Sequence, residues 1–126
     1  MERYQFEIRF RLAAELKQSY SYVEMVHCLG NSGLQDIELE RVGFLNYKDT
    51  PLALPLPSDM RSEEAESIGH EIIRRLGQAL GWDPRHLSGT LVLWGQGRAN
   101  EEDAQQARQM LIKQGFTVFL ERLSAS

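Results

Sequence analysis

Few residues in this chain have the type and spacing of a catalytic centre. His70-Glu71 begins like the zinc-protease helix motif, in which a second histidine four residues after the first binds the same metal from the same helix face. Arg74 occupies that position, so one ligand is missing and a positive charge takes its place. The favoured interpretation of His70 is a surface histidine on an amphipathic helix. The histidines at 27, 70 and 86 together have no metal-ligand spacing.

A glycine pair, Gly95-Gln96-Gly97, follows an apolar run and precedes an expected helix, which is where phosphate-binding loops occur. The third glycine of such a loop is absent, and the acidic run 101–103 opposes an anion at the helix start. We interpret residues 95–100 as a tight turn with a helix cap. The alternative is a small ligand-binding protein or enzyme that uses this turn.

Cys28 is the single cysteine, which excludes an intramolecular disulfide and a four-cysteine zinc site. Its neighbour is His27, but adjacent residues of a helix point about 100° apart and do not form a ready catalytic pair. Cys28 is therefore read as a small, half-buried residue. The sequence assigns no catalytic, cofactor-binding or metal-binding residue, and an enzyme is the less favoured class.

The first strand, residues 3–12, shows the clearest pattern of the chain. Apolar residues alternate without a break with polar ones: Tyr4, Phe6, Ile8, Phe10 and Leu12 against Gln5, Glu7, Arg9 and Arg11. Side chains of a strand alternate between two faces, so one face is apolar and the other polar. The pattern predicts a strand with one face on the core and the other facing water or a partner.

The remaining patterns predict the order β-α-β-β-α-β-α-β. We expect a single compact domain over 1–126 of class α+β or α/β, with three helices covering one face of a mixed sheet of four or five strands. If the domain divides, the seam falls at 83–90. After the first strand, the expected elements are a helix ending at Gly30, a strand around 37–40, an edge strand at 52–56, a helix over 62–80, an interior strand at 91–94 covered on both faces, a helix capped by Asn100 and a strand from Phe116.

The second strand supplies the candidate partners of the first. Ile37 and Leu39 point inward there, and Glu38 and Glu40 point outward. If the two strands pair, the side chains of Arg9 and Arg11 face those of Glu38 and Glu40.

These four charged residues and Trp82 form the predicted partner-binding set. Trp82, beside Gly81, is most simply a core residue; the alternative that places it in this set is a partly exposed contact anchor, because tryptophan is enriched in interface hot spots. Trp94 is predicted to be a core residue.

Composition favours an ordinary globular protein. The 126 residues include 42% hydrophobic ones and carry a net charge of −4, which argues against a basic nucleic-acid arm. No signal peptide and no run long enough to span a bilayer is recognised, so we expect a cytoplasmic protein that neither enters a membrane nor needs a cofactor.

Three functions remain, in order of preference. The first is a non-catalytic protein-binding module, an accessory, inhibitor or regulatory protein, of which a homodimer is one form. The second is a nucleic-acid-associated protein using Arg9, Arg11 and Lys17. The third is the ligand binder or enzyme at the Gly95–Asn100 turn.

One stretch has a family likeness. Residues 91–121 run from Leu-Val-Leu-Trp-Gly-Gln-Gly through an Asn-Glu helix start and an alanine-containing helix to Gly-Phe-Thr-Val-Phe-Leu-Glu. This stretch resembles the first half of a SPOR domain, a family that binds denuded peptidoglycan glycans. The resemblance implies a strand-helix-strand unit there.

Overall fold

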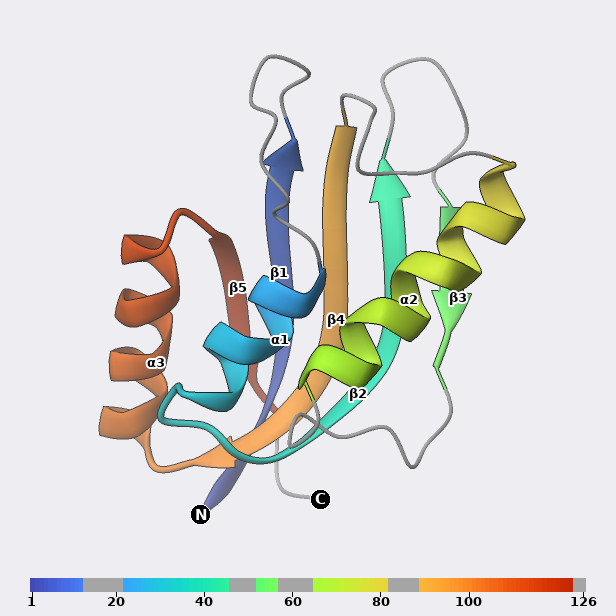
Figure 1. Cartoon of the computed structure of the whole chain (residues 1–126). Helices are drawn as coiled ribbons and strands as arrows, with labels where there is room; N and C mark the ends of the chain where they lie inside the picture. The colour runs from blue at the N-terminus through green and yellow to red at the C-terminus, as the bar shows by residue number, and fades with distance from the viewer. Residues whose placement is uncertain (13–21, 46–51, 57–64, 82–88, 124–126) are drawn as a thin grey trace.

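The computed structural model describes residues 1–12, 22–45, 52–56, 65–81 and 89–123. Within them the chain forms one five-stranded sheet and three helices in the predicted order (Figure 1). The elements are β1 (Glu2–Leu12), α1 (Tyr22–Gly30), β2 (Gln35–Leu45), β3 (Leu52–Pro55), α2 (Ala65–Leu80), β4 (Gly89–Ala99), α3 (Glu101–Lys113) and β5 (Thr117–Arg122).

The strands lie in the order β3-β2-β4-β1-β5, and all four neighbouring pairs are antiparallel. The sheet is thus antiparallel throughout rather than mixed in direction, which selects the α+β alternative. Each helix joins two parallel strands that are separated by one antiparallel strand, an arrangement known as a split β-α-β unit. β4 therefore lies between β1 and β2, so the pairing of these two strands that the sequence left as a condition does not occur.

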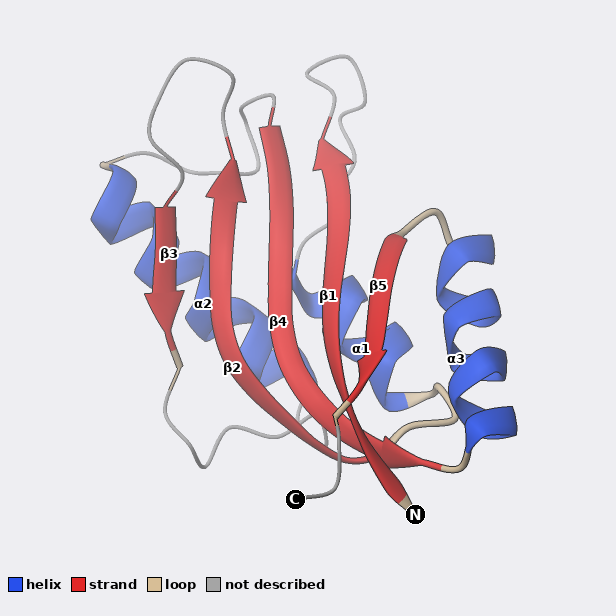
Figure 2. Cartoon of the chain, turned by 180° about the vertical axis from the view of Figure 1, so that it is seen from behind, coloured by secondary structure: helices blue, strands red, loops and turns tan. Residues whose placement is uncertain are grey.

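All three helices lie on one side of the sheet. Figure 1 shows α1 and α2 in front of the strands and α3 beside β5, and Figure 2 shows the opposite side with no helix over it. We call the uncovered side the open face. One hydrophobic core fills the covered side, and its largest fully buried side chains include Phe6, Ile8, Tyr22, Ile72 and Leu93.

The predicted alternation of β1 is confirmed, because Tyr4, Phe6 and Ile8 are buried on the covered side and Phe10 packs against the core. Each fully buried side chain of this size contributes about 1.5–3 kcal/mol before entropy is subtracted. The side chain of Leu12 is outside the described residues.

The helices follow their apolar stripes. Ile68, Ile72 and Leu76 are buried along α2, whereas Ala79 is exposed. Gly81 ends the helix with a φ of 76°, a conformation that glycine adopts at little cost. Ser62, the expected first residue of this helix, lies outside the described residues.

Helix α3 begins as predicted. The side chain of Asn100 accepts a hydrogen bond from the backbone N–H of Asp103 at 2.8 Å. Ala104, Ala107 and Leu111 form its buried face.

Tyr22 joins the helix layer to the centre of the sheet. Its hydroxyl contacts the carbonyl oxygens of Gly43 on β2 and, at 3.2 Å, Val92 on β4. The two strands pair at these residues, so the phenol is held across a strand boundary. Complete burial raises the pKa of Tyr22 far above its ordinary value.

Candidate functional site

The open face carries a row of interacting side chains that crosses four strands. Its members are Arg41 on β2, Trp94 on β4, Glu7 and Arg9 on β1, and Phe119 on β5. We call this set the aromatic–arginine row. The register places Arg41 opposite Trp94, Trp94 opposite Glu7, and Glu7 opposite Phe119. Residues that lie directly opposite each other share a face, so the row follows from strand pairing.

Trp94 is the centre of the row. Its indole Nε1 donates a hydrogen bond to Oε1 of Glu7 at 2.6 Å. The far end of its ring lies over Gly43, where an added Cβ would come within 2.8 Å of two ring carbons. The Arg41 guanidinium carbon stands 4.6 Å from the ring centroid, within cation–π range. The indole thus bridges β1, β4 and β2.

Arg9 extends the row to the edge strand. Its Nε donates to Oε2 of Glu7 at 3.1 Å, and its guanidinium carbon is 5.4 Å from the centroid of the Phe119 ring. Glu7 therefore accepts from Trp94 and Arg9 at the same time. Phe119 is 54% exposed, a large apolar side chain presented to solvent. Partly exposed ion pairs contribute only about 0–1 kcal/mol, so the row organises a surface more than it stabilises the fold.

The open face is positively charged in an acidic protein. By register it carries five arginines and three glutamates, a net charge of +2: Arg3, Arg9, Arg11, Arg41 and Arg98 against Glu7, Glu38 and Glu121. Since the whole chain has a charge of −4, the remaining residues carry −6. The open face is thus opposite in sign to the sum of all other residues of the chain.

The predicted partner-binding residues do not form one cluster. Arg9 belongs to the row, and Arg11 is exposed on the same face opposite Thr90. Glu38 is exposed opposite Gln96, across β4 from β1. The expected facing of Arg9 and Arg11 with Glu38 and Glu40 is wrong, because β4 inserts between the two strands.

Glu40 and Trp82 are the remaining two residues of the predicted partner-binding set. Glu40 is the extra residue of a bulge, since Leu39 pairs with Gly95 while Arg41 pairs with the preceding residue, Trp94. Its carbonyl accepts a hydrogen bond from Leu56 N–H at 2.7 Å. Trp82 lies outside the described residues.

A small polar hollow of about 250 Å³ surrounds Glu38 at the other end of the open face. Its lining residues are Arg3, Asp36, Glu38, Gln96, Gly97 and Arg98. Asp36 adopts a φ of 50°, where a second irregularity in β2 shifts the register. The two arginines and two carboxylates balance, so this hollow has no net charge to select an ion.

Sequence reasoning missed Trp94, Arg41 and Phe119. Trp94 was expected in a strand covered on both faces, but it is half-buried on the open face. The signal was present: Leu91 and Leu93 point inward, so a period of two sends Trp94 outward. No such pattern pointed to Arg41. Ile37 and Leu39 point inward, so a period of two would send Arg41 inward as well. The bulge at Glu40 shifts this alternation by one residue and places Arg41 on the open face.

The turn predicted at Gly95–Asn100 is wrong, since β4 continues to Ala99. The glycines serve close packing inside the sheet. A Cβ on Gly95 would lie 2.4 Å from the carbonyl oxygen of Glu38 and 2.6 Å from the Phe6 ring. Residues 95–99 are therefore part of a strand rather than of a turn.

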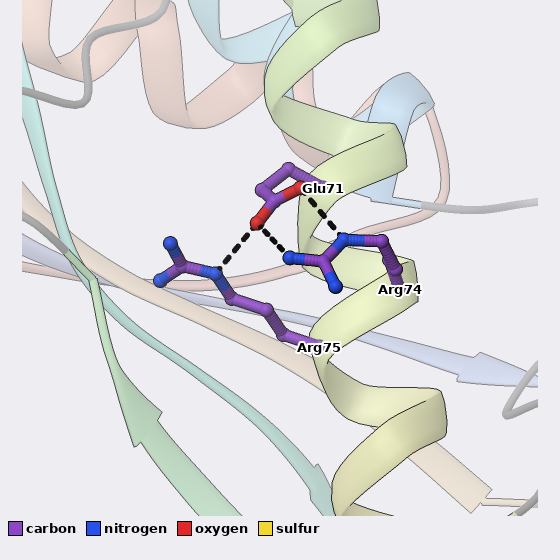
Figure 3. Close-up of polar contacts among 3 residues, drawn as sticks. All are labelled: Glu71, Arg74 and Arg75. Atoms are coloured by element: carbon purple, nitrogen blue, oxygen red, sulfur yellow. Dashed lines mark hydrogen bonds and ion pairs between the residues drawn. The ribbon is translucent and has the colours of Figure 1, made fainter.

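The segment that begins like the zinc-protease motif lies on α2. His70 is exposed, and its neighbour Glu71 accepts hydrogen bonds from Arg74 at 2.6 and 3.0 Å and from Arg75 at 2.9 Å (Figure 3). These bonds lower the pKa of Glu71 to about 2. Among the described residues no group of three or more His, Cys, Asp or Glu side chains could hold a metal ion.

Cys28 is half-buried as expected. Burial, assisted by the nearby Glu24 carboxylate, raises the pKa of its thiol. A raised pKa lowers the thiolate fraction, which is the reactive form.

Comparisons with protein-family models, with curated proteins and with solved structures find no match, so the likeness of residues 91–121 to a SPOR domain has no support from them. Within the described residues, no helix has the length and apolar character needed to cross a bilayer.

Proposed function

We propose that this chain is a non-catalytic protein-binding module that uses its open sheet face. The observation that carries the proposal is the aromatic–arginine row, in which Arg41, Trp94, Glu7, Arg9 and Phe119 are held by one another across four strands. Tryptophan and arginine are enriched among the residues that dominate binding energy in protein interfaces. The partner in this proposal is a protein that covers these side chains.

The row is suited to binding because its members are already ordered. Immobilising a long side chain at an interface costs about 0.5–1.5 kcal/mol, and a side chain fixed beforehand avoids much of that cost. The Trp94 ring is held by its hydrogen bond to Glu7 and by packing over Gly43. The Arg9 guanidinium is held by its ion pair with Glu7. Phe119 supplies the exposed apolar surface at the end of the row.

A second candidate function is binding of single-stranded nucleic acid. The favouring observation is that two aromatic side chains, Trp94 and Phe119, share a face of net charge +2. Bases stack on aromatic rings of such sheets while arginines contact phosphates. It ranks second because Arg41 already lies against the Trp94 ring, and because Glu7 stands between the aromatics.

Affinity capture with the tagged full chain tests the proposal. Lysate treated with nuclease is passed over wild type and over three charge reversals on the open face, Arg9→Glu, Arg11→Glu and Arg41→Glu. We expect a stoichiometric protein partner that survives moderate salt and is lost from Arg9→Glu and Arg41→Glu. Lys113→Glu, the same charge change on the exposed side of α3, is the matched control and should retain the partner.

The outcomes separate the two functions. Retention of the partner by both Arg9→Glu and Arg41→Glu, with thermal unfolding unchanged, would refute the open face as the binding surface. The nucleic-acid candidate is tested by measuring the binding of fluorescent twelve-nucleotide oligo-dT and oligo-U to the full chain. Binding that falls steeply with salt and is weakened by Phe119→Ala would support it, and no binding at low salt would end it.

A further inference from the structure

Among the residues that the structure describes, the outward main-chain groups of β5 have no hydrogen-bond partner. The backbone N–H of Leu123 donates to the carbonyl oxygen of Arg3 at 2.9 Å, which continues the β1–β5 register. Hydrogen-bonded and non-hydrogen-bonded pairs alternate in an antiparallel ladder. Thr117, Phe119 and Glu121 therefore direct their main-chain groups toward β1. Those of Val118 and Leu120 point away from the sheet.

The two edges of the sheet differ in their protection. β3 is only four residues long and includes Pro55, and both features discourage pairing with another strand. β5 spans six residues, contains no proline and exposes Phe119 at its centre. Of the two edges, β5 is the one whose residues permit addition of a strand.

A hollow of about 750 Å³ runs along this edge. It is lined by Glu7 and Trp94 on the open face, by residues 118–121 of β5, and by Gln105 and Arg108 of α3. Figure 2 shows α3 beside β5, beyond the last strand of the sheet. The hollow therefore passes from the row, around the edge of β5, to the exposed side chains of α3. Its volume is within the range of ligand-binding clefts.

We propose that β5 accepts an extended segment of a partner protein, which adds as a sixth strand between β5 and α3. Main-chain hydrogen bonds to Val118 and Leu120 would supply affinity, and side chains would alternate between two surroundings. This inference rests on the proposed function, since it names what the protein partner presents. It extends the binding surface from the open face to the adjoining edge.

The lining residues define the chemistry of the segment. On the α3 side, the added strand meets Gln105 and the exposed guanidinium of Arg108, for which no ion pair is found among the described residues. On the open-face side it meets Phe119. An extended segment with an acidic residue beside an apolar one satisfies both sides, because neighbouring side chains of a strand point in opposite directions.

A peptide segment fits this edge better than a second copy of the chain. Two-fold pairing of β5 with itself would bring a second α3 to the same edge, where α3 already lies beyond β5 (Figures 1 and 2). A single extended peptide brings no helix with it.

Hydrogen exchange of the free, full chain is the first test. The amides of Thr117 and Phe119 should be protected by β1, while those of Val118 and Leu120 exchange rapidly. Protection of Val118 and Leu120 equal to that of their neighbours at low protein concentration would show that the edge is already covered, and would overturn the proposal.

The second test pans a phage-displayed library of random seven-residue peptides against the full chain. Enriched peptides are then synthesised, and their affinity is measured by fluorescence anisotropy. We expect acidic and apolar residues at adjacent positions and slower exchange of Val118 and Leu120 on binding. Arg108→Glu should weaken binding about tenfold or more, as expected for loss of a charge-assisted hydrogen bond. Lys113→Glu on the same helix is the matched control and should bind as wild type.

A third test leaves the protein unaltered and uses variants of an enriched peptide, each methylated at one backbone nitrogen, whose affinities are compared. Methylation should weaken binding at every second position only, because alternate N–H groups of the added strand face β5. A uniform effect, no enrichment, or loss with Arg41→Glu but not with Arg108→Glu would overturn the edge proposal and leave the open-face proposal standing. A dimer that protects the same two amides would assign the edge to a second copy instead.

Discussion

The two faces of one sheet have opposite compositions in this protein. On the covered face, Phe6, Ile8 and Leu93 are 2% exposed or less and belong to the hydrophobic core. On the open face, the same strands present Glu7, Arg9 and Trp94, which hydrogen-bond to one another. Alternation along β1 and β4 thus sends apolar side chains into the core on one side and leaves charged and aromatic side chains exposed on the other.

Side chains of the open face are not all exposed. Val92 belongs to it by register but is fully buried, and Gly43 beside it leaves the space that the Trp94 ring occupies. Trp94 is therefore both a cover for the sheet and the centre of the candidate binding row. Substitutions on the two faces should separate these roles.

The largest expected effect is on the covered face. Leu93→Ala removes a fully buried side chain and should lower the free energy of unfolding by about 2–5 kcal/mol, through lost burial and the cavity left behind. Phe119→Ala on the open face should change it by about 0.5 kcal/mol or less. Urea denaturation of both variants measures the difference. Equal destabilisation would show that Phe119 on the open face stabilises the fold as much as a core residue does.

Gly43→Ala should have an intermediate effect, because the substitution disturbs packing on the open face. The new methyl group would overlap Trp94 and the carbonyl oxygen of Leu52, which costs about 1–3 kcal/mol if the ring must move. We expect a changed emission of Trp94 in a Trp82→Phe background, together with weaker partner capture. Gly97→Ala is the control, because its nearest contact is a side-chain carbon at 3.2 Å. Unchanged Trp94 emission in Gly43→Ala would show that the row does not depend on this glycine.

The smallest expected effect lies away from both faces, on the outer side of α2. The pKa of Glu71 is lowered in the folded state, so its pairing with Arg74 and Arg75 stabilises the fold above the unfolded-state pKa and is lost as the pH falls toward about 2. Glu71→Gln should therefore lower Tm slightly at about pH 6, with a difference that shrinks by about pH 3. A difference that grows on acidification would contradict the sign of this pKa shift. Arg74→Gln should show the same trend, since it removes one partner of the same pairing.

Local patterns in the sequence determined the elements and their inward faces. The alternation of β1, the Ile68–Leu76 stripe of α2 and the Asn100 cap of α3 each depend on residues a few positions apart, and the structure confirms all three. Such signals are local because side-chain direction repeats every 2 residues in strands and about 3.6 in helices. The order of elements follows from them, whereas the choice between α+β and α/β required the strand directions, which the structure gives as antiparallel.

Only the tertiary structure decided which strands are neighbours and which residues meet on the open face. The insertion of β4 between β1 and β2 separates Arg9 from Glu38, and it brings Trp94 to Glu7, 87 residues away along the chain. The bulge at Glu40 places Arg41, rather than Glu40, opposite Trp94. Strand order and bulges are set by the packing of the whole sheet against its helices, an energy shared among distant segments, so no local pattern reveals them.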